Sequence, residues 1–560
     1  MSDPERANDA DEAGTAGRSG CAAAVIGVLG AGTMGSGIAQ LAARSGARTL
    51  LHDPIADALE RGLARARDGL QKEAARGKLS PEGATASIER LQTVDSLDAF
   101  SPCDLVIEAV PERIELKHEL YARLSEIVSE ECVLASNTSS LLVTAIAAAA
   151  SHPERVVGMH FFNPAPIMRL LEVVAGEQSG ERALGVAHAT GKAMGKTVIR
   201  AHDGPGFLVN RCNRPFGLEA LRLLQEQIAD VETIDRICRM HGGFRMGPFE
   251  LMDLVGVDTG FEISKSFYEQ SFGEPRWRPS MIAARYVAAG LHGRKSGRGY
   301  YPYPDGPKTG GTSYRTQDPE PIEEGSVPGD GVVVISGEGV LADELRDAAT
   351  RAGYEVRGPH EPSAGTLPSL AIECDPSPPQ REQASAPVGQ PDRRGTHPTK
   401  PGGARLLLCA KGSLGSLDPG GSAVGFHALP PLGKARLVEL TRNESSSPVA
   451  AERAERFFAA LGKHVAWVGD APGLVLGRIV CQIINESAFA LGEGVGEARD
   501  IDLGMVLGLS HPHGPFEWLE AIGVEHVLTV LEALCAEYRE ERYRPAPALL
   551  RISRSGSEAR

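Results

Sequence analysis

The chain has 560 residues, of which 42% are hydrophobic and 23% are charged, as in a soluble globular protein of several domains. Its net charge of −15 argues against non-specific nucleic-acid binding, and no apolar run is long enough to span a membrane. Nine scattered cysteines without metal-ligand spacing predict reduced thiols in a cytoplasmic protein and no metal site.

The first predicted element after a polar, disordered tail (residues 1–22) is the apolar strand Val25 to Leu29. A G-x-G-x-x-G turn, a helix-length segment and a second strand that ends at Asp53 follow it. This order predicts a Rossmann dinucleotide-binding fold whose glycine turn and helix start hold the pyrophosphate. The residues expected there are Gly30, Gly32, Thr33, Met34 and Gly35. Asp53 stands where an acid binds the ribose 2′-OH, which favours NAD over NADP.

The next segment, Ile55 to Arg76, predicts a long helix with Lys72, Arg76 and Lys78 near its end. A solvated helix face is one interpretation of these charges. The other interpretation is a basic surface at the edge of the site that binds a phosphorylated substrate.

Four more strand-like runs follow, namely 104–110, 132–135, 155–161 and 168–174. The polar residues 136–140 come directly after the second run, where ligands bind in open α/β sheets. The last two runs predict a hairpin about Pro166, which places His160 opposite Glu172. Such a pair is either a general base with its orienting carboxylate or a buried structural ion pair. Spacing alone does not separate these two interpretations.

From Asp203 the pattern becomes helical for about a hundred residues. The second half then repeats the first, because His160 and Glu172 recur 267 residues later as His427 and Glu439. The blocks 203–206 and 247–250 recur at the same offset. In the second copy Ala342 replaces the third glycine of the turn, and no acid ends the strand that follows it.

The second dinucleotide fold is therefore interpreted as a degenerate copy, while its helical partner looks complete. We expect an α/β Rossmann domain at 23–202, an all-α domain at 203–303 and a linker at 304–330. A degenerate Rossmann-like remnant at 331–469, with a disordered insert near 376–403, and a second helical domain at 470–560 complete the chain.

Six motifs together resemble the 3-hydroxyacyl-CoA dehydrogenase family: GAGTMG, ASNTSSL, GMHFFNPAPIMRLLEVV, DGPGFLVNR, MGPFELMDLVG and GRKSGRGYY. The resemblance runs from about Val25 to Tyr303. The two-copy layout is similar to that of bacterial 3-hydroxybutyryl-CoA and 3-hydroxyadipyl-CoA dehydrogenases of the phenylacetate-catabolic type. It implies NAD-dependent oxidation of an (S)-3-hydroxyacyl-CoA, in fatty-acid β-oxidation or in aromatic catabolism.

The resemblance also implies a role for individual residues. His160 matches the catalytic base, Glu172 its partner, and Ser139 and Asn210 the groups that contact the C3 oxygen of the substrate. The residues that match the lining of the NAD site are Glu112, Lys117, Ser139, Asn163 and Lys295. For CoA only Lys72, Arg76 and Lys78 can be proposed, because Gly69 stands where the family has a serine.

Two other functions are considered. A dehydrogenase of free β-hydroxy acids would use a catalytic lysine, against which the His160 and Glu172 pair argues. A non-catalytic NAD-binding protein would have no need for Ser139, His160, Glu172 and Asn210 together. The expected partners are an acyl-CoA substrate, no nucleic acid and no membrane. The helical domains are expected to pack as an intramolecular pseudo-dimer, and a homodimer is also possible.

Overall fold

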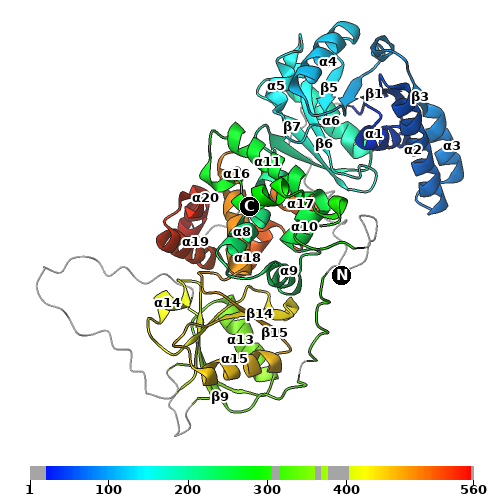
Figure 1. The fold of residues 1–560 in the computed structure, drawn as a ribbon. Coiled ribbons are helices and arrows are strands. Elements are labelled where there is room, and N and C mark those ends of the chain that lie inside the picture. The colour runs from blue at the N-terminus through cyan, green and yellow to red at the C-terminus, as the bar shows by residue number, and fades with distance from the viewer. Residues whose placement is uncertain (1–20, 305–314, 324, 360–367, 376–402, 556–560) are drawn as a thin grey trace, which may run out of the picture. The chain divides into compact units, whose positions relative to one another are not determined.

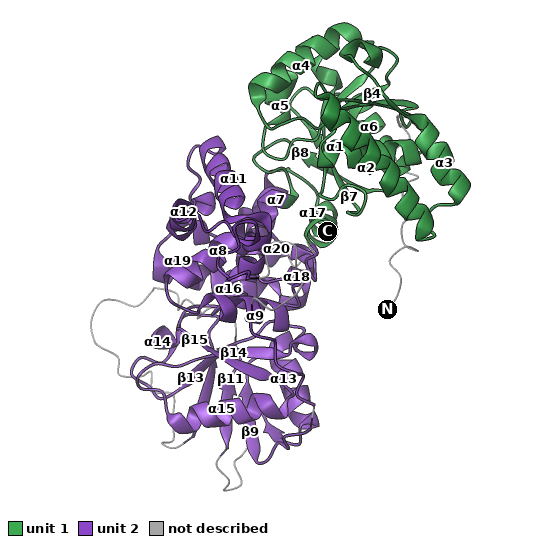
Figure 2. Cartoon of the chain, turned by 45° about the vertical axis from the view of Figure 1, so that its right-hand side comes forward, with its two compact units in different colours: residues 1–209, 494–509 green, residues 210–493, 510–560 purple. Residues whose placement is uncertain are grey.

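The computed structural model describes residues 21–304, 315–323, 325–359, 368–375 and 403–555. The predicted tail and nearly all of the predicted insert near 376–403 lie outside these residues. The chain divides into two compact units, which Figure 2 shows in different colours. Unit 1 contains residues 1–209 and 494–509, and unit 2 contains residues 210–493 and 510–560. Residues 494–509 therefore group with the first sheet, although the residues before and after them in the sequence belong to unit 2.

Unit 1 is built on an eight-stranded sheet in the order β3-β2-β1-β4-β5-β6-β7-β8. Its strands are β1 (Val25–Leu29), β2 (Arg48–His52), β3 (Leu91–Thr93), β4 (Leu105–Glu108), β5 (Val133–Ser136), β6 (Val156–Phe161), β7 (Leu170–Ala175) and β8 (Thr197–His202). All neighbours are parallel except β6 and β7, which form the predicted antiparallel hairpin. The parallel strands read as continuous apolar runs because helices cover both faces of the sheet.

The helices of this first α/β region follow the strands in chain order (Figure 1). They are α1 (Thr33–Arg44), α2 (Ala56–Ala75), α3 (Pro81–Arg90), α4 (Ile114–Ile127), α5 (Val143–Ala147) and α6 (Glu181–Ala193). A core of fully buried aliphatic side chains, such as Ile26, Ile38 and Val157, joins the sheet to these helices.

The first helical region contains α7 (Val209–Cys212), α8 (Arg214–Gln225), α9 (Val231–Met240), α10 (Pro248–Val255), α11 (Val257–Gln270) and α12 (Met281–Ala288). The repeated Gly-Pro-Phe-Glu block is a helix start. The Glu250 carboxylate accepts a hydrogen bond from the Gly247 N–H at 2.9 Å, with Pro248 in the first turn. Glu517 and Gly514 make the same contact at 2.9 Å. This block therefore recurs because it begins a helix in both copies.

The second sheet has seven strands in the order β10-β9-β11-β12-β13-β14-β15. They are β9 (Val332–Ser336), β10 (Glu355–Arg357), β11 (Leu370–Glu373), β12 (Arg405–Leu408), β13 (Val424–His427), β14 (Leu437–Thr441) and β15 (His464–Val468). The helices α13 (Val340–Arg351), α14 (Leu414–Leu417) and α15 (Pro448–Ala460) accompany them. The described strands match those of the first sheet one for one, apart from β3. This sheet is more complete than the damaged glycine turn suggests.

The last helices are α16 (Leu476–Gly492), α17 (Ala498–Leu509), α18 (Pro515–Ile522), α19 (Val524–Tyr538) and α20 (Pro547–Ser555). Within unit 1, α17 packs on β7 and β8, and the His202 N–H donates to the Val495 carbonyl at 2.8 Å. Within unit 2, α9 packs on β14, and the Gly469 N–H donates to the Ile228 carbonyl at 2.6 Å. Both partners of the second bond lie 267 residues from their counterparts in the first. Each copy thus lends the same helix to the sheet of the other copy.

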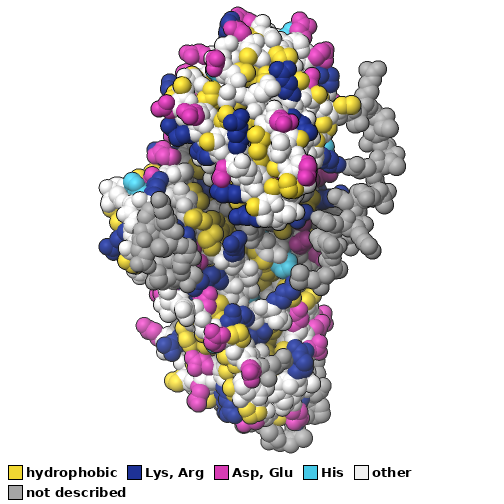
Figure 3. Space-filling view, turned by 90° about the vertical axis from the view of Figure 1, so that its right-hand side faces the viewer, with side chains coloured by type: hydrophobic (Ala, Val, Ile, Leu, Met, Phe, Trp, Pro, Cys, Tyr) yellow, Lys and Arg dark blue, Asp and Glu magenta, His cyan; other side chains and the backbone are white. Residues whose placement is uncertain are grey.

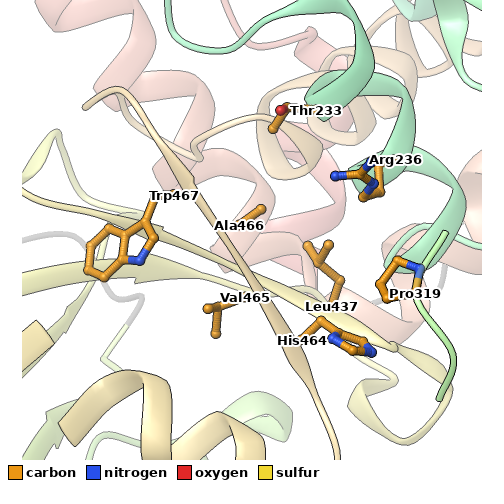
Figure 4. A pocket seen from close by; sticks show the side chains of 8 residues that line it. All are labelled: Thr233, Arg236, Pro319, Leu437, His464, Val465, Ala466 and Trp467. Atoms are coloured by element: carbon orange, nitrogen blue, oxygen red, sulfur yellow. The ribbon is translucent and has the colours of Figure 1, made fainter. Parts of the chain in front are cut away.

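Acidic and basic side chains are interspersed over the face shown in Figure 3. Among the described helices, none is long and apolar enough to cross a membrane. A cavity of about 270 Å³ in unit 2 lies between α9 and β15, and its lining includes Thr233, Arg236 and Trp467 (Figure 4). In unit 1 the residue at the place of Thr233 is Asp500, whose carboxylate accepts from the Arg200 N–H at 3.0 Å. No predicted site residue lines the cavity.

Candidate functional site

His160 and Glu172 face each other across β6 and β7, as the sequence predicts. The His160 Nδ1 lies 2.6 Å from Glu172 Oε2, and both side chains are buried. An ionised carboxylate only accepts hydrogen bonds, so Nδ1 carries the proton and donates. This tautomer leaves Nε2 as the nitrogen that can accept a proton, as a general base requires.

The second oxygen of Glu172 is also fixed. Oε1 accepts from the backbone N–H groups of Leu208 and Val209 at 3.2 and 3.0 Å. The His160 ring packs against the rings of Phe162 and Phe207, with centroids 4.7 and 5.7 Å away. Apolar walls and three hydrogen bonds therefore hold the pair in one orientation, which is what preorganised catalysis needs.

A buried lysine lies behind the polar loop that follows β5. The Lys117 ammonium is 2.8 Å from both Glu108 oxygens, 3.4 Å from Ser136 Oγ and 3.2 Å from Glu112 Oε2. The ammonium thus joins the ends of β4 and β5 to the start of α4. Lys117 is 1% exposed, so its role here is to hold the loop in place.

Glu112 fixes the loop that carries Ser139. Its Oε1 accepts from the Thr138 hydroxyl at 2.5 Å and from the Ser139 and Ser140 N–H groups at 2.9 and 3.2 Å. Burial alone would raise the pKa of Glu112, but Lys117 and these donors outweigh burial and lower the pKa below its usual value. Glu112 is therefore ionised at neutral pH, and Ser139 itself is exposed on the ordered loop.

The glycine turn has the shape that a dinucleotide needs. Gly30 has φ +98°, and a Cβ there would lie 2.6 Å from the Ala109 carbonyl oxygen. A Cβ on Gly35 would lie 1.8 Å from the Gly30 oxygen, so α1 could not approach the turn with any larger residue. Gly32 faces open space, and α1 has no side-chain cap at its N-terminus. The first-turn amides of Thr33 and Met34 are thus available to an anion.

Asp53 follows β2 at the same edge of the sheet. Its Oδ2 accepts from the Ala31 N–H at 2.8 Å, and its Oδ1 accepts from the Ile55 N–H at 3.0 Å. Each carboxylate oxygen keeps a further lone pair for a ribose hydroxyl. The turn, the helix start and the acid are thus brought together in unit 1, and they fit NAD.

The remaining predicted residues are placed as follows. Asn163 is exposed in the turn of the hairpin, while Lys72, Arg76 and Lys78 are exposed at the end of α2 and just after it. Lys72 is 65% exposed and pairs with Asp68 at 2.6 Å, which also fits a solvated helix face. Asn210 and Lys295 belong to unit 2, where the Lys295 ammonium is 2.6 Å from Asp258.

The counterpart pair in unit 2 differs, although His427 and Glu439 are again register partners. The two side chains nevertheless make no hydrogen bond to each other. His427 Nε2 lies 3.1 Å from His526 Nε2, and its Nδ1 has no hydrogen-bond partner among the described residues. Glu439 instead accepts only from the Val475 and Leu476 N–H groups, at 2.6 and 3.0 Å.

The missing side chain of Gly477 explains this rotation. Gly477 stands where the first copy has Asn210, and a Cβ on Gly477 would lie 2.1 Å from His427 Cε1. The His427 ring therefore occupies the space that an asparagine would need. Unit 2 has lost the geometry of a base with its partner.

Sequence reasoning singled out the loop 136–140 but missed two polar residues that hold the site, Glu108 and Lys196. Glu108 anchors the Ser139 loop together with Ser136 and Thr138. Lys196 donates to the Ala165 and Met168 carbonyls in the hairpin turn, at 2.5 and 2.6 Å. A signal for Lys196 was present, because its counterpart at the 267-residue offset, Lys463, donates to the Leu432 and Ala435 carbonyls in the same way.

The comparisons with known proteins agree with this geometry. Residues 25–204 match the model of the 3-hydroxyacyl-CoA dehydrogenase NAD-binding domain, and residues 206–303 and 473–559 match that of the C-terminal domain. The chain is 33% identical to the 3-hydroxyadipyl-CoA dehydrogenase of Escherichia coli, over 94% of this chain and 96% of that protein. A probable 3-hydroxybutyryl-CoA dehydrogenase of Deinococcus radiodurans is 40% identical over 50% of this chain and 99% of its own length.

A solved structure is similar over nearly the whole chain. The crystal structure of an Escherichia coli 3-hydroxybutyryl-CoA dehydrogenase superposes with a TM-score of 0.76 and 32% identity. The match covers 95% of this chain and 99% of that one, so the similarity includes both copies.

Proposed function

The chain belongs to the 3-hydroxyacyl-CoA dehydrogenase family, and on that premise we propose how it works as an NAD-dependent 3-hydroxyacyl-CoA dehydrogenase. The observation that carries the proposal is the 2.6 Å contact between His160 Nδ1 and Glu172. It supports a general base with its orienting carboxylate, which is the role that the family resemblance implies for the two residues.

The reaction turns the C3 hydroxyl of the substrate into a carbonyl. The Nε2 of His160 takes the hydroxyl proton as the C3–H bond breaks, and Glu172 stabilises the imidazolium that forms. NAD, when bound, accepts the hydride from C3. Ser139 and Asn210 hold the C3 oxygen as it becomes the carbonyl oxygen. A positioned base of this kind contributes roughly 10²–10⁴ in rate.

The residues proposed to hold NAD are Gly30, Gly32, Thr33, Met34, Gly35, Asp53, Glu112, Lys117, Ser139, Asn163 and Lys295. The open face of Gly32 and the free lone pairs of Asp53 support the first part of this set. Lys117 is buried among carboxylates, which supports a role in holding the loop beside the cofactor.

For the substrate we propose (S)-3-hydroxybutyryl-CoA or (S)-3-hydroxyadipyl-CoA, since proteins with these printed activities are among the similar ones. Lys72, Arg76 and Lys78 are proposed to meet the CoA phosphates, because they are exposed together at the end of α2. A cytoplasmic location is part of the proposal, on the ground of the scattered cysteines.

The two helical regions are proposed to form a pseudo-dimer within one chain. In unit 2, α8 packs against α16, and the ion pairs between the two helical regions are related by the 267-residue offset. Arg211 pairs with Glu486 and Glu493 at 2.9 and 2.7 Å. Arg478 pairs with Glu219 and Glu226 at 2.5 and 2.6 Å. Such self-complementary pairing is typical of two-fold interfaces.

Turnover tests the activity directly. Acetoacetyl-CoA and NADH should give a fall in absorbance at 340 nm, and a panel of acyl-CoA substrates should rank chain lengths. A protein that binds NADH but consumes none would instead be a non-catalytic NAD-binding relative. Turnover of free 3-hydroxybutyrate in place of its CoA ester would indicate a dehydrogenase of free acids.

A further inference from the structure

Helix α17 belongs by sequence to the second copy, yet it packs in unit 1 beside the His160 and Glu172 pair. Gly508 is the residue of this helix that lies against Phe162. A Cβ there would lie 3.3 Å from Cε1 of Phe162 and 2.8 Å from Cδ2 of Leu170. Phe162 is the residue whose ring packs 4.7 Å from the His160 ring. The backbone of α17 thus supports the aromatic wall of the proposed base.

Two more glycines of the second copy support the carboxylate. A Cβ on Gly504 would lie 2.6 Å from Cγ2 of Val209, and one on Gly496 would lie 2.7 Å from Cδ2 of Leu208. Leu208 and Val209 are the residues whose N–H groups bind Glu172 Oε1. The second copy therefore contacts every backbone donor that holds the carboxylate.

The equivalent positions on α9 and at its two ends, which face the altered pair in unit 2, carry larger side chains. Ala229, Ile237 and His241 stand where the second copy has Gly496, Gly504 and Gly508. His241 is buried, and its Nε2 accepts from the N–H of Leu429, the counterpart of Phe162. Glycines therefore face His160 and Glu172, which are hydrogen-bonded to each other. Larger side chains face His427 and Glu439, which are not.

We propose that α17 is a positioning element for the catalytic pair, with Gly508 as its main positioning residue. This inference rests on the proposed role of His160 as the base. A side chain at position 508 would push Phe162 toward the imidazole and displace Nε2 from the substrate hydroxyl. A side chain at position 504 would push Val209 and weaken its bond to Glu172. The second copy thus contributes to chemistry in the first without touching the substrate.

The test is Gly508→Leu in the full-length protein, with Val506→Leu as the control on the same helix. We expect kcat to fall about ten- to a hundredfold, the cost of misplacing a reacting group by about 1 Å. The dissociation constant for NADH, measured by fluorescence, should stay unchanged because the glycine turn is untouched. The acidic limb of the kcat/KM profile against pH should shift, since the surroundings of His160 change. Val506→Leu should leave all three readouts as in the wild type.

A rescue experiment separates positioning from loss of structure. In unit 2, Leu429 stands at the place of Phe162 and lies opposite His241, which stands at the place of Gly508. Adding Phe162→Leu to Gly508→Leu should therefore recover part of the lost kcat. The variant Phe162→Leu alone serves as the reference. A Gly508→Leu protein that binds NADH and keeps the kcat and pH profile of the wild type overturns the inference. If this variant does not fold, Gly508→Ala and Gly504→Ala are measured in the same way, and unchanged kcat in both overturns it.

The failure of this inference differs from that of the proposed function. If His160→Gln keeps its activity, His160 is not the base and both statements fall. If His160→Gln is inactive while the Gly508 and Gly504 variants are normal, only the positioning role is wrong.

Discussion

At His160 the chemistry depends on one hydrogen bond and on what surrounds it. The carboxylate of Glu172 fixes the tautomer, and the Leu208 and Val209 N–H groups fix the carboxylate. His427 in the second sheet has the same neighbour in register, but its ring has turned to His526. Register alone therefore does not make a general base, since the imidazole must also be held at the correct nitrogen.

Replacing the proposed base should remove turnover and spare cofactor binding. We expect His160→Gln to lower kcat by about 10²–10⁴ while the NADH dissociation constant stays near that of the wild type. Glu172→Gln should have a similar or milder effect, because glutamine cannot stabilise an imidazolium ion. Stopped-flow and steady-state assays with acetoacetyl-CoA measure both. Retention of more than about a tenth of the rate in His160→Gln is incompatible with a general base.

Asp53 should set the choice of cofactor. Its carboxylate stands at the end of β2 beside the glycine turn, where a 2′-phosphate would meet like charge. We expect a large preference for NAD over NADP in kcat/KM. The variant Asp53→Ala should reduce this preference, because it weakens the binding of NAD. Equal use of the two cofactors by the wild type would refute this role of the acid. Asp57→Ala, on the exposed start of α2, serves as the control.

At the scale of elements, the β6 and β7 hairpin is the part of the site that the sequence predicts best. Its register follows from the alternation of side chains about Pro166, which is a local property of the chain. The glycine turn, the acid after β2 and the helical nature of the segment after Asp203 are likewise local patterns, and the structure confirms them. The short β3 carries no comparable pattern.

Other features depend on residues that meet only after folding. The rotation of His427 requires the gap at Gly477 and a second histidine 99 residues further along the chain. The anchoring of Ser139 by Glu112 and Lys117 joins the ends of three elements. No periodicity reports such contacts, so the sequence identified these residues only through family resemblance or not at all.

Buried histidines should make unit 2 sensitive to acid. Burial lowers the pKa of His526 to about 4. Burial also lowers the pKa of His241 to about 4, because it outweighs the hydrogen bond with Leu429, which raises the pKa. Histidine in the unfolded chain has a pKa near 6.5, so as the pH falls the unfolded chain binds protons at a higher pH than the folded protein does. The contribution of these two histidines to stability is therefore complete above pH 6.5 and falls as the pH drops toward 4, by about 3 kcal/mol for each group.

Unfolding midpoints in denaturant between pH 4 and 7.5 measure this loss. His526→Gln should flatten the dependence and leave turnover at neutral pH unchanged, because His526 lies beside the altered pair. A His526→Gln midpoint that changes with pH as much as the wild-type midpoint would contradict the assignment. Glu439 acts in the opposite direction, because burial raises its pKa to about 8, so its contribution is lost as the pH rises from 4.5 through 8.

At the scale of the whole molecule, the ion pairs between the two helical regions should matter for folding. Glu486 is buried between Arg211 and Arg276, at 2.9 Å from each. Removing its charge leaves two buried cations, of which Arg211 keeps only the half-exposed Glu493 and Arg276 keeps Glu274. Glu486→Gln should therefore cost roughly 3–5 kcal/mol of unfolding free energy. Equilibrium denaturation measures the cost.

The matched control uses the same arginine. Glu493 also pairs with Arg211, at 2.7 Å, but its side chain is 48% exposed. Glu493→Gln should therefore cost about 1 kcal/mol or less. Equal losses in the two variants would show that burial does not govern these pairs.

The exchange of α9 and α17 has a consequence for how the two halves can diverge. In a homodimer with a two-fold axis, one gene encodes both halves, so any substitution appears twice. A histidine at the place of Gly508 would then face both catalytic pairs at once. Here two separate codons specify the two helices, and His241 faces one pair while Gly508 faces the other. One half can therefore carry larger side chains beside its pair while the other keeps the space around His160.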